Sequence, residues 1–317
     1  MPRHTTHPGF TLSCRGMAAA LLFALACAFA CTAARAQESG QHPSWPKTIR
    51  FGINPWGAEN EMRDMFRPLM DYIQEHLGVS VQIVIPTSYE DLLDRAAAGE
   101  LDLMSFNSVT YLKARRRGLP LQYLATMERL YEGESQPRDS YIGYIIVHKD
   151  SLFKSLKDLQ GHTFAFVEES SASGYKMPVA ILGTQYNTTP KKFFKKFFFV
   201  GDHNEVMSAV FNHCVDGGAT WDNSYAMNTT PDKLGNNFRI VARTPPIPND
   251  AWVTGPAVPP DMHRAILDLL LSLGPDTRTA AGVLVIDQAL GFPGSGWSKR
   301  GPEFYEDAAD LLLYDQQ

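Results

Sequence analysis

The sequence predicts an α/β protein with two lobes, each a mostly parallel sheet flanked by helices. From Ile49 to Arg117, short apolar segments alternate with amphipathic segments, the order typical of parallel βαβ units. A long apolar segment at 141–147 then leads into a second series with the same alternation. A proline-rich segment at 244–250 is where we expect the chain to return to the first lobe.

The first lobe is predicted to comprise residues 48–141 and 250–317. Its strands are short apolar runs that end in turn residues, expected at 49–53, 79–85 and 101–104. Its helices have apolar residues three and four positions apart, expected at 62–77, 90–98, 109–117, 264–273, 278–290 and 303–313.

The second lobe is predicted to comprise residues 142–249. Its strands are expected at 163–167, near 200, at 215–220 and at 238–242. Its helices are expected at 151–159, 177–186 and 205–213.

The N-terminus has the pattern of a secretory signal peptide over residues 1–36, followed by a polar linker at 37–47. Arg3 and Arg15 precede an apolar block, and Ala34-Arg35-Ala36 is a small-x-small cleavage site. We therefore expect export to the periplasm. A lipid anchor at Cys27 or Cys31 is the competing interpretation, although neither has a leucine three positions upstream.

Charge and cysteine content exclude several classes of function. Residues 1–36 hold three of the 29 basic residues and none of the 34 acidic ones, so the remaining chain has a net charge near −8. This balance argues against nucleic acid as a partner. Cys214 is the one cysteine beyond the signal, which leaves no disulfide and no cysteine metal cluster, and we interpret it as a small buried residue on a helix.

The stretch Glu-Glu-Ser-Ser-Ala-Ser-Gly-Tyr at 168–175 is the most informative in the chain. It lies between a predicted strand and a predicted helix, where unpaired backbone N–H groups and the helix dipole favour an anion. Hydroxyl residues at a helix start also act as caps. Two further strand ends carry His203 and Asp222, and their position at the same sheet edge favours ligand binding.

This combination of side chains suits a tetrahedral oxyanion. Serine hydroxyls, backbone N–H groups and His203 can donate hydrogen bonds to its oxygens. The Asp222 carboxylate can accept from a protonated ligand oxygen or a ligand amine, and it would disfavour a fully deprotonated ligand.

From about Ile49 to the C-terminus, the chain resembles the phosphonate/phosphite-binding family of periplasmic substrate-binding proteins of ABC importers. The motifs that carry the resemblance are Tyr89, Leu101-Asp102-Leu103, Tyr111, YIIVHKDS at 144–151, SSASGY at 170–175 with Pro178, GDH at 201–203, VDGGA at 215–219 and PPIPN at 245–249.

The resemblance implies a type II periplasmic binding fold with a ligand between the two lobes. It implies that the oxyanion is held by Ser171, the Ala172 backbone, Ser173 and His203, with Asp222 beside them and Tyr89 from the facing lobe. Trp56 and Tyr141 are further candidates, and the sequence leaves open whether these two and Trp221 line the cleft or pack in the core.

Two positions depart from the family pattern. Ala172 replaces the second hydroxyl of the serine motif, and Phe106-Asn107 replaces the glycine-proline that precedes the helix of Tyr111. Oxyanion binding is compatible with both changes, but the identity of the rest of the ligand is not fixed.

We therefore expect a monomeric, non-enzymatic receptor, with no cofactor and no metal, that delivers a phosphonate or phosphite-like ligand to an ABC permease. The alternative is an oxyanion sensor that signals to a membrane histidine kinase. A serine hydrolase using Ser173 and His203 is disfavoured, because no Gly-x-Ser-x-Gly motif surrounds the serines. The histidines also lack paired metal-ligand spacing.

Overall fold

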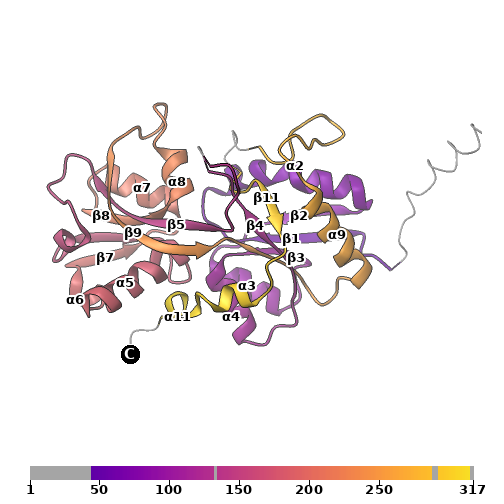
Figure 1. The fold of residues 1–317 in the computed structure, drawn as a ribbon, viewed down its shortest axis with the longest axis horizontal. Helices are drawn as coiled ribbons and strands as arrows, with labels where there is room; N and C mark the ends of the chain where they lie inside the picture. The colour runs from indigo at the N-terminus through magenta and orange to yellow at the C-terminus, as the bar shows by residue number, and fades with distance from the viewer. Residues whose placement is uncertain (1–43, 132–133, 288–291, 315–317) are drawn as a thin grey trace, which may run out of the picture. The chain divides into compact units, whose positions relative to one another are not determined.

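The computed structural model describes residues 44–131, 134–287 and 292–314. These residues form two β-sheets with flanking helices, which confirms the predicted fold class (Figure 1). The predicted signal peptide and the candidate anchor residues Cys27 and Cys31 lie outside the described residues. The predicted limits of the two lobes remain a prediction.

The first sheet has the strand order β11-β4-β10-β3-β1-β2. Strands β2, β1 and β3 pair in parallel, whereas β10, β4 and β11 are antiparallel to their neighbours, so the sheet is mixed. Its strands are β1 (Thr48–Ile53), β2 (Ser80–Val84), β3 (Leu103–Phe106), β4 (Gln122–Glu128), β10 (Ala251–Thr254) and β11 (Gly296–Ser298).

The second sheet has the order β7-β6-β8-β5-β9 and repeats this plan, with a parallel part (β7, β6, β8) and two antiparallel strands, β5 and β9. Its strands are β5 (Ser140–His148), β6 (Thr163–Phe166), β7 (Lys196–Phe199), β8 (Gly217–Trp221) and β9 (Phe238–Pro248).

The antiparallel strands follow from the path of the chain. Strand β5 enters the second sheet from the first and runs against β8, whereas β9 runs against β5, in the direction of the parallel strands, and leads back to β10 (Figure 1). The proline-rich segment predicted as a return connection is mostly the end of β9. Pro245 and Pro246 fit there because β9 is an edge strand, where a missing N–H breaks no ladder on the open side.

Helices cover both faces of the first sheet. Helix α2 (Glu59–Leu77) and α9 (Pro260–Ser272) pack with Phe51 in one core cluster, while α3 (Tyr89–Ala97), α4 (Ser108–Arg116) and α11 (Ala309–Leu312) pack in another. The predicted apolar stripe of α2 is buried, and Gly78, with φ of 65°, ends that helix.

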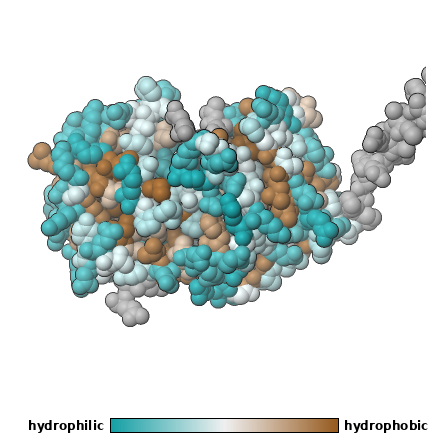
Figure 2. Space-filling model, viewed as in Figure 1, coloured by the Kyte–Doolittle hydropathy of each residue, from teal (hydrophilic) through white to brown (hydrophobic). Residues whose placement is uncertain are grey.

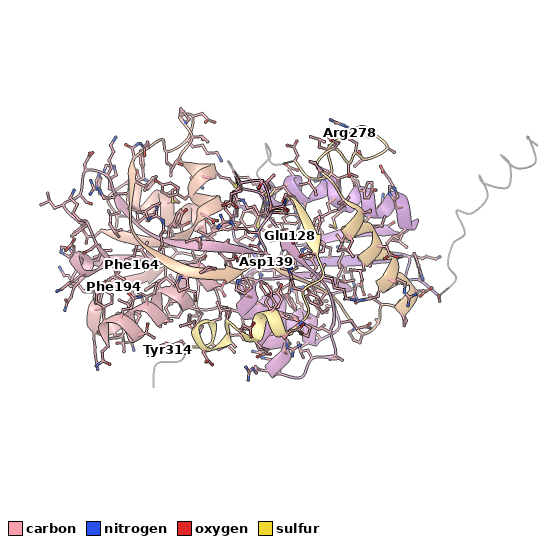
Figure 3. All side chains as sticks on the ribbon, in the orientation of Figure 1. Glu128, Asp139, Phe164, Phe194, Arg278 and Tyr314 are labelled. Carbon is pink, nitrogen blue, oxygen red and sulfur yellow. The ribbon has the colours of Figure 1, made fainter. Side chains whose placement is uncertain are left out.

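The second sheet is covered in the same way. Helices α5 (Met177–Tyr186) and α6 (Pro190–Phe193) lie on one core cluster, and α7 (His203–Phe211) lies on the other. In the first of these clusters Phe164 and Phe194 stack with ring centroids 4.4 Å apart (Figure 3). Two shorter helical segments complete this part, a 3₁₀ turn at Leu156–Leu159 and α8 (Asp222–Asn228).

An ion-pair cluster lies where the chain passes between the sheets. Arg300 approaches Glu128 at 3.2 Å and Asp139 at 2.8 Å, two carboxylates labelled in Figure 3. Glu128 ends β4 and Asp139 precedes β5, so the C-terminal segment contacts both ends of this connection.

Four sequence predictions need correction. The helix expected at 151–159 is only a 3₁₀ turn at Leu156–Leu159. The helix expected at 278–290 is absent from 278–287, where Arg278 and Leu284 form an antiparallel bridge and Gly282 adopts a φ of 81°. The helix expected at 303–313 is divided into α10 (Glu303–Glu306) and α11. Cys214 is exposed rather than buried, because α7 ends at Phe211 and the cysteine lies in the turn that follows.

Hydrophilic residues cover much of the surface visible in Figure 2, with apolar patches scattered among them. Of the helices in the described part of the chain, none combines the length and apolar character needed to cross a membrane.

The fold predicts a large stability loss from truncating Trp252. This fully buried side chain stacks on Phe51 at 5.1 Å and meets Trp297 edge-on at 5.2 Å. Trp252→Ala should lower the free energy of unfolding by about 3–5 kcal/mol, because it leaves a cavity in the core. Urea denaturation measures this change, with Leu152→Ala, 89% exposed, as the control expected to change little. Equal stabilities of the two variants would contradict the packing described here.

Candidate functional site

A cavity of about 40 Å³ lies between the two sheets, at the carboxyl ends of their parallel strands. Each sheet contributes three such ends, β1, β2 and β3 from the first and β6, β7 and β8 from the second. The lining residues are Asn54, Trp56, Tyr89, Asn107, Met127, Tyr141, Ser171, Ala172, Ser173, His203, Trp221, Asn249, Asp250 and Pro293.

The serine stretch after β6 forms a π-helical turn, Ala172–Lys176, that continues into α5. Ser171 caps this turn, since its hydroxyl accepts a hydrogen bond from the Gly174 N–H at 3.1 Å. The helical segment therefore begins five residues before the expected start at 177, and the backbone N–H groups of Ala172 and Ser173 belong to its first turn.

Gly174 is required by the close packing of this turn. A Cβ atom added there would lie 2.5 Å from Val167 Cγ2 and 2.7 Å from Ser171 Oγ. Glycine thus permits the turn to pack directly against Val167, the residue that follows β6. This packing places Ser171 and Ser173 in the cavity wall.

Two tyrosines supply protonated hydroxyls to the cavity. Burial raises the pKa of Tyr89 well above its ordinary value, and the nearby Glu168 charge adds to the effect. Burial likewise raises the pKa of Tyr141, with a further contribution from Asp250. The Tyr89 hydroxyl bonds with Ser171, and the Tyr141 hydroxyl with Ser173. Both phenols therefore remain hydrogen-bond donors at neutral pH.

His203 contributes a neutral imidazole. It is the first residue of α7, which is capped by the Asp202 side chain, and its ring is buried. Burial lowers the pKa of His203 to about 3, so the ring is uncharged at neutral pH. Its Nδ1 lies 3.2 Å from Thr220 Oγ1, which fixes the ring and leaves Nε2 for another partner.

Asp250 adds a carboxyl group to a wall otherwise rich in donors. It follows β9 and accepts a hydrogen bond from Ser105 Oγ at 3.1 Å. Burial raises the pKa of Asp250 to about 6. The group can therefore accept a hydrogen bond when ionised, and its charge is less stable here than in water.

Direct contacts between the sheets surround the cavity. The Glu168 carboxylate accepts from the Tyr89 backbone N–H at 3.1–3.2 Å. The Ser170 carbonyl accepts from Asn107 Nδ2 at 3.2 Å, and Lys113 Nζ lies 2.7 Å from Ser170 Oγ. These bonds place the serine turn against the N-termini of α3 and α4.

The structure brings together seven of the eight predicted site residues. Trp56, Tyr89, Tyr141, Ser171, Ala172, Ser173 and His203 all line the cavity, as does Trp221. Their binding roles stay predictions.

Asp222 is the predicted residue that is not in the cavity wall. Its carboxylate accepts from the Ile142 N–H at 3.1 Å and lies 3.5 Å from Arg129 Nη1. Burial raises the pKa of Asp222, and the Arg129 charge, the Ile142 N–H and a hydrogen bond with Tyr131 offset part of this rise. These contacts hold the carboxylate on β5 and the connection that precedes it.

Sequence reasoning missed five residues of the cavity wall, Asn54, Met127, Asn249, Asp250 and Pro293, and named Asn107 only as a departure from the family pattern. Asn54 and Asn107 had a usable signal, since each follows a predicted strand of the first lobe. Asn249 and Asp250 were assigned to the return connection, and only the pairing of β10 within the first sheet brings them to the cavity.

Among the described side chains, no group of three or more histidine, cysteine, aspartate or glutamate residues is arranged to hold a metal ion. The cavity instead concentrates hydroxyl, amide and aromatic groups around a single carboxyl, Asp250, which is the chemistry of anion binding rather than of cation coordination.

Comparison with known proteins shows what this arrangement corresponds to. The chain has the type II periplasmic binding protein fold. Residues 51–293 match the family described as "ABC transporter, phosphonate, periplasmic substrate-binding protein". The chain therefore belongs to the phosphonate-binding family of periplasmic substrate-binding proteins of ABC transporters, a family of binding proteins rather than enzymes.

Individual relatives are distant. The chain is 25% identical over 203 residues to the phosphate-import protein PhnD of Mycolicibacterium smegmatis, covering 62% of this chain and 61% of that protein. It is 22% identical over 234 residues to the phosphonates-binding periplasmic protein of Escherichia coli, covering 72% and 67%. The chain thus spans less than two thirds of the length of the first of these relatives and about two thirds of the second. The structure of PhnD1 from Prochlorococcus marinus in complex with methylphosphonate has a TM-score of 0.73 at 20% identity, covering 85% of this chain and 98% of that one.

The raised pKa of Asp250 predicts how the stability of the ligand-free protein depends on pH. Between its unfolded pKa near 4 and its folded pKa of about 6, the folded state holds a proton that the unfolded chain releases. The contribution of Asp250 to stability is therefore present below about pH 4 and lost as the pH rises through about 6.

Asp250→Asn should remove this dependence. The difference in free energy of unfolding between variant and wild type should shift in favour of the variant by about 2–3 kcal/mol from pH 4 to pH 7.5. Urea denaturation of both proteins at both pH values measures this difference in the free energy of unfolding. Groups that titrate in both proteins, such as His203, contribute equally to the two values and do not affect the difference. A difference that does not change with pH would contradict the raised pKa.

Proposed function

We propose that this protein is an exported solute receptor that binds a small phosphorus oxyanion, phosphonate or phosphite-like, between its two sheets and delivers it to an ABC permease. The observation that carries the proposal is the convergence of six strand ends on one cavity rich in hydrogen-bond donors. Membership in the phosphonate-binding family supports this proposal. The similar structure of PhnD1 from Prochlorococcus marinus, which is a complex with methylphosphonate, supports it as well.

The second sheet supplies the main anion-binding wall in this proposal. The hydroxyls of Ser171 and Ser173 and the backbone N–H groups of the π-helical turn donate to the oxyanion oxygens, and the helix dipole favours negative charge there. Ala172 has no hydroxyl, so at this position only the backbone can donate. Neutral His203 supplies one donor if Nε2 carries the ring proton.

The first sheet closes the cavity through Tyr89, whose hydroxyl reaches the serine turn. Tyr141 is the corresponding donor from β5, the strand that enters the second sheet. A ligand that bonds to both sides stabilises the closed arrangement over an open one, and this difference is what a permease can recognise.

Asp250 takes the role that the sequence suggested for Asp222. A carboxylate in an anion site needs a hydrogen from the ligand, either from a protonated phosphorus oxygen or from an amine. Asp250 lines the cavity, whereas Asp222 is held by Arg129 and the Ile142 N–H. We propose that Asp250 favours ligands that carry such a hydrogen over fully deprotonated ones.

The size of the cavity and its aromatic residues limit the organic part of the ligand. A volume of about 40 Å³ accommodates a small oxyanion rather than a nucleotide-sized molecule. Trp221 packs edge-on against Trp56 at 5.8 Å and against Tyr141 at 5.4 Å, forming an apolar wall for a small substituent.

The proposal predicts measurable binding by the purified protein without its signal peptide. Isothermal titration calorimetry and thermal unfolding with phosphite, methylphosphonate, aminoethylphosphonate and phosphate test it directly. At least one of these anions should raise the melting temperature at millimolar concentration. If none does so, the proposed function is wrong.

Ser173→Ala provides the matched test of the site. It removes a hydroxyl from the cavity wall and should weaken binding of the best ligand about tenfold or more, the usual value of a hydrogen bond to a charged group. Ser272→Ala removes an exposed hydroxyl at the end of α9 and should leave the affinity unchanged. Equal affinities of the two variants would exclude Ser173 from the binding site.

A further inference from the structure

Asn54 is a buried side chain of the cavity wall whose amide nitrogen has no hydrogen-bond partner among the described residues. It follows β1 of the first sheet, is 1% exposed and lines the cavity together with Ser171 and His203. We infer that the Asn54 amide donates a hydrogen bond to the bound oxyanion and is a specificity-determining contact from the first sheet. This inference rests on the proposed function.

The surroundings of Asn54 fix the direction of its amide. Its Oδ1 accepts from Thr110 Oγ1 at 3.4 Å, a hydroxyl in the first turn of α4. Its backbone carbonyl accepts from the Trp56 N–H at 3.0 Å. With the oxygen held by Thr110, the NH₂ group is the part of the side chain left to meet a ligand.

Two other asparagines in the same wall, Asn107 and Asn249, have side-chain amides that are hydrogen-bonded within the protein. Asn107 accepts from the Thr110 N–H at 2.7 Å and donates to the Ser170 carbonyl at 3.2 Å. Asn249 donates to the Arg138 carbonyl at 3.1 Å, and its backbone N–H bonds to the Asp139 carbonyl. Both amide nitrogens are satisfied within the protein, in contrast with that of Asn54.

A buried N–H group without a partner is destabilising, because folding removes its bonds to water without replacing them. An oxyanion oxygen in the cavity supplies a strong acceptor, and hydrogen bonds to a charged group are stronger than neutral ones. No group in the described part of the protein pairs with the Asn54 amide nitrogen, so a bound oxyanion supplies an acceptor that those residues do not. Asn54 thus contributes to affinity through a donor that they leave available.

This contact also has a geometric consequence. The serine turn belongs to the second sheet and Asn54 to the first, so a ligand that bonds to both connects the two sheets. Tyr89 begins α3 and its hydroxyl reaches Ser171 directly, whereas the Asn54 amide nitrogen has no partner in the described part of the protein and lies in the cavity wall. Its bond should therefore form only with ligand present.

The test compares Asn54→Leu with Asn249→Leu, two changes of the same type in the same wall. Asn54→Leu should weaken binding of the best oxyanion about tenfold or more and lower the ligand-free melting temperature less than Asn249→Leu does, because the bond it removes, from Thr110 Oγ1 at 3.4 Å, is longer than the 3.1 Å bond of Asn249. Asn249→Leu should lower the ligand-free melting temperature, because it breaks a satisfied bond. A merely structural Asn54 would behave like Asn249, and that result would overturn the inference.

Asn54→Asp keeps the shape and replaces the donor by an acceptor. At neutral pH it should weaken binding more than Asn54→Leu does, about a hundredfold or more, because a carboxylate then faces an anion. Titration calorimetry of wild type and both variants with phosphite, methylphosphonate and phosphate separates the possible failures. Absence of binding by wild type would count against the proposed function, whereas wild-type binding with unchanged affinity in both variants would refute the role of Asn54 alone.

Discussion

The contact between Glu168 and the first turn of α3 is the interaction on which the functional arrangement depends. Both carboxylate oxygens of Glu168 lie 3.1–3.2 Å from the Tyr89 backbone nitrogen, where a negative charge meets the positive end of a helix dipole. Glu168 lies two residues before Ser170, where the serine turn begins, and Tyr89 is the first residue of α3, the helix that faces it. Together with the contacts of Asn107 and Lys113 to Ser170, the Glu168 contact holds the proposed anion-binding turn next to Tyr89.

Most of the described polar groups that line this cavity can donate hydrogen bonds, and only one of them is a carboxyl. Hydroxyls, amides, backbone N–H groups and a neutral imidazole face a space with one carboxyl, that of Asp250. Burial keeps the tyrosines protonated and His203 uncharged, so the wall attracts an anion through oriented dipoles rather than through positively charged side chains. In the proposed function, dipoles of this kind hold the oxyanion, and Asp250 favours a ligand that carries a hydrogen.

Residues that follow strands were predictable, and residues defined by sheet pairing were not. Ser171, Ser173, His203 and Tyr89 each come just after an apolar run or begin a helix, and parallel strands carry such positions to one edge of a sheet. Asp222 also follows a parallel strand, β8, but its carboxylate contacts Arg129 and the Ile142 N–H and does not line the cavity. Those partners come from the connection between the lobes, whose path no local pattern reveals.

The sequence by itself determined the α/β class, the serine turn as a helix start with unpaired backbone N–H groups, and a set of residues that line one cavity. These follow from periodicity and from backbone groups that every helix start exposes. Only the tertiary structure decided that the sheets are mixed, that Asp250 rather than Asp222 lines the cavity, and that Asn54 holds an unpaired amide there. The reason is physical: pairing, burial and the satisfaction of hydrogen bonds depend on segments far apart in the chain, which meet only when the fold is complete.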